Sequence, residues 1–351
     1  MSFDCTRPVG RGRFVRTMCE HLFVRWENLE VGKEEAEARL PGFREPAVVR
    51  TFDAPEALGI RFYEVQARSA LNQVPKRSRM PFRWTINAYR GCTHACTYCF
   101  ARPTHTYLDL NAREDFEREI VVKVNVPELL RVELGRPSWK GEHVALGTNT
   151  DPYQWVEGRY KLMRGIWEAM RDFANPCSVL TKSPLLLRDI DLMQQIAKRT
   201  DFTANLSIPT LDEKAWRDTE PHTPHPRKRI EAVAELKRAG LRTGVLIAPL
   251  IPGVNDAPEQ VEPLLELLDE AGPDSIGGVA LHLRGEVRDI WFDWLRERRP
   301  DLLPRYEELY ERGAYMRKDE ASRLSSMVRR PGRSGPGRGI VKQEEPPERE
   351  V

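Results

Sequence analysis

The chain has 351 residues, of which 40% are hydrophobic and 31% are charged. That is enough apolar material for one sizeable core, and a chain above about 250 residues commonly carries segments outside its main domain. The 55 Lys and Arg residues nearly balance 53 Asp and Glu residues, so the net charge of +2 excludes a global electrostatic drive toward nucleic acid or membrane. The sequence has no apolar run of the roughly 18 residues that span a membrane and no signal-peptide core. We therefore expect a cytoplasmic protein.

The two ends of the chain are expected to lie outside the main fold. Residues 1–81 have weak periodicity and scattered charge, which predicts an N-terminal extension with little core of its own. Residues 329–351 are mostly Pro, Gly and charge, and we predict a disordered tail there. The core should span 82–285, followed by a C-terminal helical segment over 286–328.

Between these ends, short apolar runs rich in β-formers alternate with longer helical patterns. The expected strands are Trp84 to Tyr89, His143 to Leu146, Cys177 to Thr181, Phe202 to Ser207, Arg242 to Ala248 and Ser275 to Leu281. The expected helices are Arg113 to Leu134, Lys161 to Phe173, Arg188 to Lys198, Pro226 to Ala239 and Pro258 to Glu270. This alternation predicts an α/β fold with parallel strands, either an open doubly wound sheet or a partial barrel. In both, ligands gather at the carboxyl ends of the strands.

Three of the six cysteines crowd into GCTHACTYCF, directly after the first predicted strand. Cys92, Cys96 and Cys99 are spaced at i, i+4 and i+7, and a loop with that spacing can wrap three thiolates around one face of an iron–sulfur cubane. Six cysteines are too few for a disulfide scaffold in a chain of this length, so clustered thiols indicate a metal site. Because only three ligands are supplied, a fourth iron would stay open to a small chelating molecule.

Other interpretations of the thiols remain open on the residues alone. His94 or His105 could complete a closed tetrahedral zinc knuckle. A ferredoxin-like carrier would need a fourth cysteine nearby, but Cys177 is far along the chain and begins a predicted buried strand, where an inert core thiol is expected. The chain could then be a non-enzymatic iron–sulfur or zinc-binding regulatory protein.

The spacing of the three cysteines, with aromatic Tyr98 before the last, resembles that of radical S-adenosylmethionine (SAM) enzymes. Further motifs resemble the branch of that superfamily related to spore photoproduct lyase, and within it an uncharacterised actinobacterial group. They are NAYRGCTHACTYCFARPTH, ALGTNTDPYQ, SVLTKSPLLLRD, EPHTPHPRKR, IAPLIPGVND and ALHLRG. The resemblance covers roughly residues 25 to 317 and leaves the first 24 outside it. It implies a partial (β/α)6 TIM-like radical SAM barrel, with an N-terminal extension, C-terminal helices and a disordered tail.

The resemblance also implies site residues and cofactors. Cys92, Cys96 and Cys99 would hold a 4Fe-4S cluster. The expected SAM contacts are Tyr98 at the adenine, Thr148, Asn149, Thr150 and Asp151 near the methionyl amine, Lys182 at the carboxylate, Ser207 at the ribose, Ala248 at the adenine edge, and Arg229 at an anion. His282, Arg284 and Glu286 follow the last predicted strand and could contact substrate.

By the same resemblance, the cluster reductively cleaves SAM to a 5′-deoxyadenosyl radical that acts on a substrate. The implied reaction is of the lyase or repair type. The implied partners are an external one-electron reductant of the flavodoxin or ferredoxin type and a substrate that the residues do not name, with nucleic acid among the candidates.

Overall fold

A computed structural model describes residues 29–30, 48–76, 78 and 80–329 of the chain. The first 24 residues and the predicted tail beyond Arg329 lie outside the described residues. Within the described part, no helix is long and apolar enough to cross a membrane.

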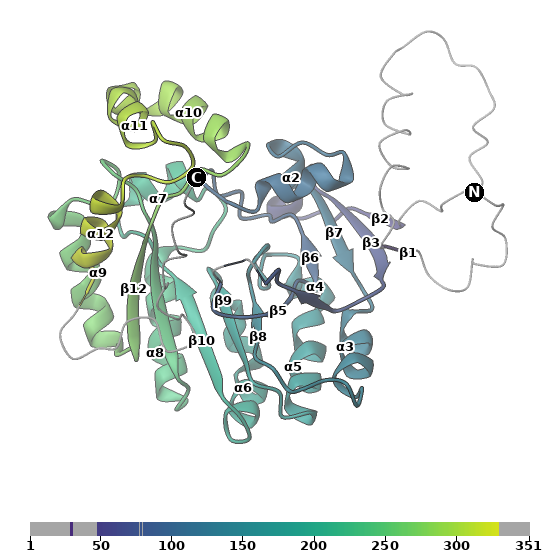
Figure 1. The fold of residues 1–351 in the computed structure, drawn as a ribbon. Coiled ribbons are helices and arrows are strands. Elements are labelled where there is room, and N and C mark those ends of the chain that lie inside the picture. The colour runs from purple at the N-terminus through teal and green to yellow at the C-terminus, as the bar shows by residue number, and fades with distance from the viewer. Residues whose placement is uncertain (1–28, 31–47, 77, 79, 330–351) are drawn as a thin grey trace, which may run out of the picture.

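The main sheet has seven described strands in the order β12-β11-β10-β9-β8-β5-β4 (Figure 1). Six of them, from β5 to β12, are parallel, and β4 pairs with β5 in the antiparallel direction at one edge. The strands are β4 (Leu71–Gln73), β5 (Trp84–Ile86), β8 (Val144–Leu146), β9 (Cys177–Thr181), β10 (Phe202–Ser207), β11 (Thr243–Leu250) and β12 (Ser275–Ala280). The predicted α/β fold with six parallel strands is confirmed, and the extra strand β4 comes from the part expected to be a lead-in.

Helices pack along the outside of this sheet and bury its apolar side chains (Figure 1). They are α3 (Val126–Leu134), α5 (Leu162–Asp172), α6 (Ile190–Ala197), α8 (Pro226–Arg238) and α9 (Pro258–Ala271), with short turns α4 (Glu157–Tyr160), η4 (Pro184–Asp189) and α7 (Glu213–Thr219) between them. The thiol of Cys177 on β9 is fully buried in this core, as expected of an inert core cysteine.

The predicted helix from Arg113 to Leu134 is wrong in its middle. The chain instead forms α2 (Glu114–Arg118), strand β7 (Glu119–Lys123) and then α3. The run Ile120, Val121 and Val122 is β-branched and completely buried, which favours a strand between two neighbours over a solvated helix face.

Strand β7 belongs to a second, smaller sheet that the expected N-terminal extension helps to build. Its described strands are β1 (Leu29–Glu30), β2 (Val48–Arg50), β3 (Arg61–Ala67), β6 (Tyr89–Arg90) and β7. Phe62 on β3 is fully buried, and the Asn125 amide holds the end of this strand by accepting from the Ala67 N–H at 2.8 Å and donating to its carbonyl at 2.9 Å. Residues 48–76, with the turn η2 (Pro55–Ala57), therefore contribute more core than the sequence indicated.

The C-terminal segment is helical, as expected. It contains α10 (Val287–Arg298), the turn η5 (Pro300–Leu302), α11 (Leu303–Leu309) and α12 (Lys318–Met327). Its last helix packs against β12, whereas α10 and α11 lie at the top of the view in Figure 1.

Tyr89 of β6 joins a largely buried polar network with residues of the connections after β8 and β9. The network, here called the Glu157 network, is formed by Tyr89, Tyr153, Glu157, Arg188 and Asp189. Arg188 pairs with Glu157 at 2.6 Å and with Asp189 at 2.7 Å. Tyr89 donates to Glu157 at 2.5 Å and Tyr153 donates to Asp189 at 2.9 Å. Both carboxylates are fully buried, so these hydrogen bonds replace the water that each charge loses on folding.

Candidate cofactor site

The three clustered cysteines lie on the loop that follows β5 and β6 at the carboxyl end of the parallel sheet. Cys92 and Cys96 are buried and Cys99 is half-buried. Gly91 begins the loop at φ +84°, and an added Cβ would come within 2.8 Å of both the His105 ring and the Phe116 carbonyl. Only glycine fits there, because the backbone passes too closely against its neighbours and adopts a left-handed conformation.

A buried arginine braces the loop from within. Arg102 donates to the carbonyls of Ala95 and Cys96, each at 3.0 Å, and pairs with Glu117 at 2.8 Å. Ala95 itself has a positive φ of 54°, an uncommon conformation for a residue with a Cβ. The guanidinium thus fixes the strained turn between the first two thiols.

The loop is also tied to the segment after β8. Thr150 donates to the Gly91 carbonyl at 2.6 Å. Gln154, which is fully buried, donates to the same carbonyl at 3.2 Å and accepts from the Thr93 N–H at 2.9 Å. Thr150 was expected near the SAM amine, but here its hydroxyl holds the cysteine loop in place.

The chemistry of the three thiols fits an iron–sulfur cluster better than a single metal ion. Burial raises the pKa of Cys92, Cys96 and Cys99, so the thiols stay protonated until a metal displaces the protons. Zinc needs its ligands about 2.0–2.3 Å from one ion, and no group of three His, Cys, Asp or Glu residues in the described part of the chain is arranged to hold such an ion. In a cubane each thiolate binds a different iron, so the sulfurs need not converge on one point.

The two histidines proposed as zinc ligands make other contacts. The Nδ1 atom of His94 lies 3.4 Å from the Asp151 carboxylate. The Nε2 atom of His105 lies 2.9 Å from the Glu119 carbonyl, and burial lowers the pKa of this imidazole to about 4. His105 therefore serves as a neutral packing residue against Phe116 behind the loop.

The segment from Gly147 to Asp151 forms a tight turn at the end of β8. An added Cβ on Gly147 would lie 1.9 Å from the Leu180 carbonyl. Asp151 accepts from the Thr181 hydroxyl at 2.5 Å and from the Lys182 N–H at 2.7 Å. Burial raises the pKa of Asp151, but His94 and these hydrogen bonds outweigh it and leave the pKa below its usual value.

Of the expected amine contacts, Asn149 is exposed and its N–H donates to the Asn87 side chain at 3.2 Å. Thr148 is half-buried, and its hydroxyl donates to the same amide oxygen at 3.4 Å. Asn149 and Thr148 therefore border the site, whereas Thr150 and Asp151 are bound into its walls.

The remaining expected SAM contacts converge on a residue that sequence reasoning did not single out, Glu220. We call this set the Glu220 network, formed by Tyr98, Lys182, Ser207, Glu220 and Arg229. The Glu220 carboxylate is fully buried and pairs with Lys182 at 2.6 Å and with Arg229 at 2.7 Å. The Tyr98 hydroxyl donates to the same carboxylate, and its ring lies 5.7 Å from the Lys182 ammonium.

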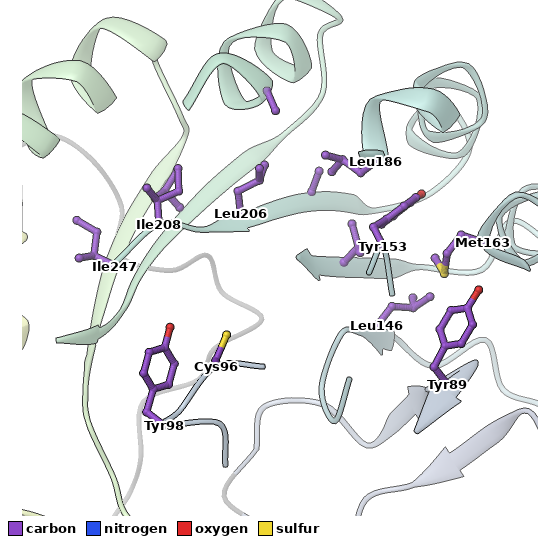
Figure 2. Close-up of a cluster of buried hydrophobic side chains, with 14 of the residues drawn as sticks. Tyr89, Cys96, Tyr98, Leu146, Tyr153, Met163, Leu186, Leu206, Ile208 and Ile247 are labelled. Atoms are coloured by element: carbon purple, nitrogen blue, oxygen red, sulfur yellow. The ribbon is translucent and has the colours of Figure 1, made fainter. Parts of the chain in front are cut away.

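The network joins three strand ends. Lys182 donates to the Ser207 hydroxyl at 2.7 Å, and that hydroxyl donates to the Ala248 carbonyl at 3.1 Å. Arg229 donates to the Ser207 carbonyl at 3.0 Å. Cys96 and Tyr98 lie together at one end of the buried cluster, with Tyr89 at the other (Figure 2). The structure thus brings together Tyr98, Lys182, Ser207, Ala248 and Arg229 beside the thiol loop.

Electrostatics set the charge state of this network. Burial raises the pKa of Glu220, but Arg229 and Lys182 outweigh burial and lower the pKa to about 2. Glu220 is therefore ionised at neutral pH. Within the five residues of the network one negative charge faces two positive charges, and the Asp151 carboxylate lies close enough to Cys92 to raise the pKa of that thiol.

The sequence did carry a signal for Glu220. It is the only acid of EPHTPHPRKR, nine residues before Arg229 on the same loop and helix start. A carboxylate next to a predicted buried cation is a candidate partner, because charges are rarely buried alone.

A partial barrel of parallel strands, with a three-cysteine loop and a cationic network at its carboxyl end, defines an enzyme that uses SAM for radical chemistry. The family model of the Radical SAM superfamily matches residues 86–277, and the chain belongs to this superfamily. The family's cofactors are a 4Fe-4S cluster and SAM.

Relatives by sequence are themselves uncharacterised. Proteins of Mycobacterium bovis and Mycobacterium tuberculosis are each 45% identical over 296 residues, which covers 84% of this chain and 87% of theirs. A protein of Methanocaldococcus jannaschii is 30% identical over 198 residues, covering 56% of this chain and 70% of its own.

Solved structures share the fold. Spore photoproduct lyase complexed with dinucleoside spore photoproduct is similar with a TM-score of 0.57 at 15% identity, and the match covers 83% of each chain. A mutant of that lyase with bound AdoMet and the dinucleoside photoproduct matches with a TM-score of 0.56 at 16% identity, covering 76% of this chain and 77% of the lyase chain.

Proposed function

We propose that this chain holds a 4Fe-4S cluster on Cys92, Cys96 and Cys99 and reductively cleaves SAM to generate a 5′-deoxyadenosyl radical. The radical then acts on a substrate in a lyase or repair-type reaction, by analogy with spore photoproduct lyase. We further propose that the core at 82–285 carries this chemistry, between the N-terminal extension at 1–81 and the C-terminal helices at 286–328.

One observation carries the proposal. The thiol loop is braced by Arg102, Thr150 and Gln154 and lies directly against a buried cationic network at the strand ends. A closed structural metal site has no need of a neighbouring surplus charge. A site that must bind a zwitterionic amino acid beside its metal does need one, because the carboxylate requires a positive partner in a dry pocket.

Different residues of this site are suited to bind different parts of SAM. Lys182 exposes 14% of its side chain and can turn from Glu220 toward an incoming carboxylate, while Arg229 is fully buried and stays with Glu220. Tyr98 supplies an aromatic wall, and Ser207 and the Ala248 backbone offer polar atoms for a ribose and a purine edge. These contacts fix the orientation of the bound cofactor and exclude water around it.

The substrate side of the site is marked by aromatic rings near the thiols. Phe100 directly follows Cys99, and its ring lies 5.7 Å from that of His282. Tyr315 lies at the same distance from His282 on another segment, and both Phe100 and Tyr315 are exposed. We assign substrate contact to this rim and keep nucleic acid among the candidate substrates. We place the enzyme in the cytoplasm, with a flavodoxin or ferredoxin type reductant.

The test is anaerobic reconstitution with iron and sulfide, addition of SAM and dithionite, and quantification of 5′-deoxyadenosine. The proposal predicts that this product and methionine form together. The alternative, a non-enzymatic iron–sulfur or zinc-binding regulatory protein, predicts neither product, and their absence from cluster-loaded protein would overturn the proposal.

A further inference from the structure

A second pair of cations lies on the smaller sheet, away from the Glu220 network. Strand β6 pairs with β7 in antiparallel register, with Arg90 opposite Val121 and Tyr89 opposite Val122. The Lys123 N–H donates to the Ala88 carbonyl at 2.9 Å, which continues the same pairing. Arg90 and Lys123 are therefore diagonal neighbours on one face of the sheet, a relation that places their Cβ atoms about 7–8 Å apart.

Apolar side chains lie around these two cations. The same face also carries Glu119, the other diagonal neighbour of Arg90, but its carboxylate is bound by Arg61 and by the Tyr63 hydroxyl. Val121, between the two cations, is fully buried in a small cluster with Val65 and Leu108. Val65 is also the direct neighbour of Lys123 across β3. Arg90 and Lys123 are both half-buried, so each charge has lost part of its water shell.

The protein supplies few partners for these two charges. Lys123 donates to the Asn87 carbonyl at 3.0 Å, and Arg90 donates weakly to the Thr104 carbonyl at 3.4 Å. Among the residues that the structure describes, neither cation has a carboxylate partner. By contrast, Lys182, Arg188 and Arg229 each pair with a buried acid. Most N–H groups of the Arg90 guanidinium and the Lys123 ammonium can therefore donate to a ligand.

Energetics make this arrangement costly without a ligand. Two like charges on one face repel, and burial adds to the cost. Burial and the charge of Arg90 lower the pKa of Lys123 to about 8. If residue 123 only packed the sheet, an apolar side chain would suit it better, because β7 is already paired with β3 and β6.

We propose that Arg90 and Lys123 form a binding site for a phosphate-type oxyanion, separate from the SAM site. A planar guanidinium and a point-charge ammonium that are diagonal neighbours beside apolar Val121 suit an anion with several equivalent oxygens. Tyr107 is exposed and lies close enough to Arg90 to interact with its charge. This inference does not depend on the radical chemistry, because anion binding needs neither electron transfer nor SAM cleavage.

The experiment measures thermal unfolding of the full reconstituted chain against inorganic phosphate at constant ionic strength, with chloride as the balancing anion. The expected result is a saturable rise in Tm for the wild type, with and without saturating SAM. Lys123→Met should lose this rise, and Lys123→Arg should keep most of it. Lys198→Met removes an exposed cation elsewhere and should respond as the wild type does.

A second readout separates a ligand site from a structural one. Without phosphate, Lys123→Met should raise Tm above that of the wild type, because it removes a buried charge that faces another of the same sign. A merely structural lysine predicts a lower Tm instead. A lower Tm with an unchanged phosphate response would overturn the inference, and so would a wild-type response that saturating SAM abolishes.

The source of the anion can be distinguished in the same assay. A dinucleotide phosphodiester and inorganic phosphate offer the same oxygens. A Lys123-dependent response at lower concentrations of the dinucleotide would identify a nucleic-acid backbone as the ligand. A Lys123-dependent response to inorganic phosphate alone would identify a free phosphate or phosphomonoester.

Discussion

The Glu157 network and the Glu220 network are both buried clusters of carboxylate, cation and tyrosine, yet their charge balance differs. In the first, the carboxylates of Glu157 and Asp189 share Arg188, and the nearby Arg164 lies closer to Asp191, at 3.0 Å, than to Asp189, at 3.5 Å. In the second, the single charge of Glu220 faces both Lys182 and Arg229. The first network therefore has one more acid than base, whereas the second has one more base than acid.

We infer from this difference that the Glu157 network is structural and that the Glu220 network binds a ligand. A buried network in which acids outnumber bases does not attract an anion. In a network with one more cation than acid, a bound anion can balance the remaining charge. Lys182 is the most exposed member of the Glu220 network. Changes near the thiols and the Glu220 network should therefore affect cofactor chemistry, and changes in the Glu157 network should affect stability alone.

The largest expected effect concerns the thiols. Separate Cys92→Ala, Cys96→Ala and Cys99→Ala variants should each reduce 5′-deoxyadenosine formation to background, because the cluster loses one of only three ligands. Cys177→Ala should keep the activity, since that thiol lies in the core of β9. Activity retained in all three loop variants would contradict the assignment.

The next effect compares one carboxylate from each network by urea unfolding. Glu220→Gln leaves fully buried Arg229 without a carboxylate partner, so we expect the free energy of unfolding to fall by about 3–5 kcal/mol. Glu157→Gln leaves Arg188 paired with Asp189, so the loss should be smaller, about 1–2 kcal/mol. Equal losses would show that the two networks do not differ as described.

A smaller effect is expected for Lys182, the more exposed cation of the Glu220 network. Lys182→Met should weaken SAM binding by about 1.5–3 kcal/mol, the range for a hydrogen bond to a charged group. Isothermal titration of the cluster-loaded protein measures this affinity. Arg188→Met, its counterpart in the Glu157 network, should lower stability yet leave the SAM affinity of the folded fraction unchanged, and the reverse pattern would contradict the comparison.

The smallest effect is a difference in pH dependence. The folded pKa of Glu220 is depressed, so the stability it contributes is present above its unfolded pKa and is lost as pH falls toward about 2. The folded pKa of Glu157 is raised, chiefly by burial, so its ionisation costs stability as pH rises above its unfolded pKa. Unfolding free energies measured from pH 3 to 6 should therefore rise less steeply with pH in Glu220→Gln and more steeply in Glu157→Gln. Parallel curves for the two variants would contradict these opposite signs.

The sequence predicted the six parallel strands well because each is a short apolar run between helical patterns. It missed β7 because EIVVK is flanked by good helix formers, and only pairing with β3 and β6 shows that this run is a strand. It also missed the contribution of residues 48–76, since their burial depends on partners such as Asn125 and Glu133 far along the chain.

For the site, cysteine spacing indicated the thiols, and the family resemblance added Lys182, Ser207 and Arg229. The structure brings all of them together at one end of the sheet. Glu220 was missed as their common partner, because its role depends on three segments meeting in space. Thr150 and Asp151 were expected as ligand contacts, yet their hydrogen bonds hold Gly91 and Lys182 in position. A motif indicates which residues matter, but it does not say which of them support the others.

The most direct measurement is electron paramagnetic resonance of the reduced, anaerobically reconstituted protein, recorded before and after SAM is added. Three thiolate ligands leave one iron open, so the account predicts a 4Fe-4S signal that changes when SAM binds. A spectrum that SAM leaves unchanged, or a purified protein that carries zinc in place of iron, would contradict it.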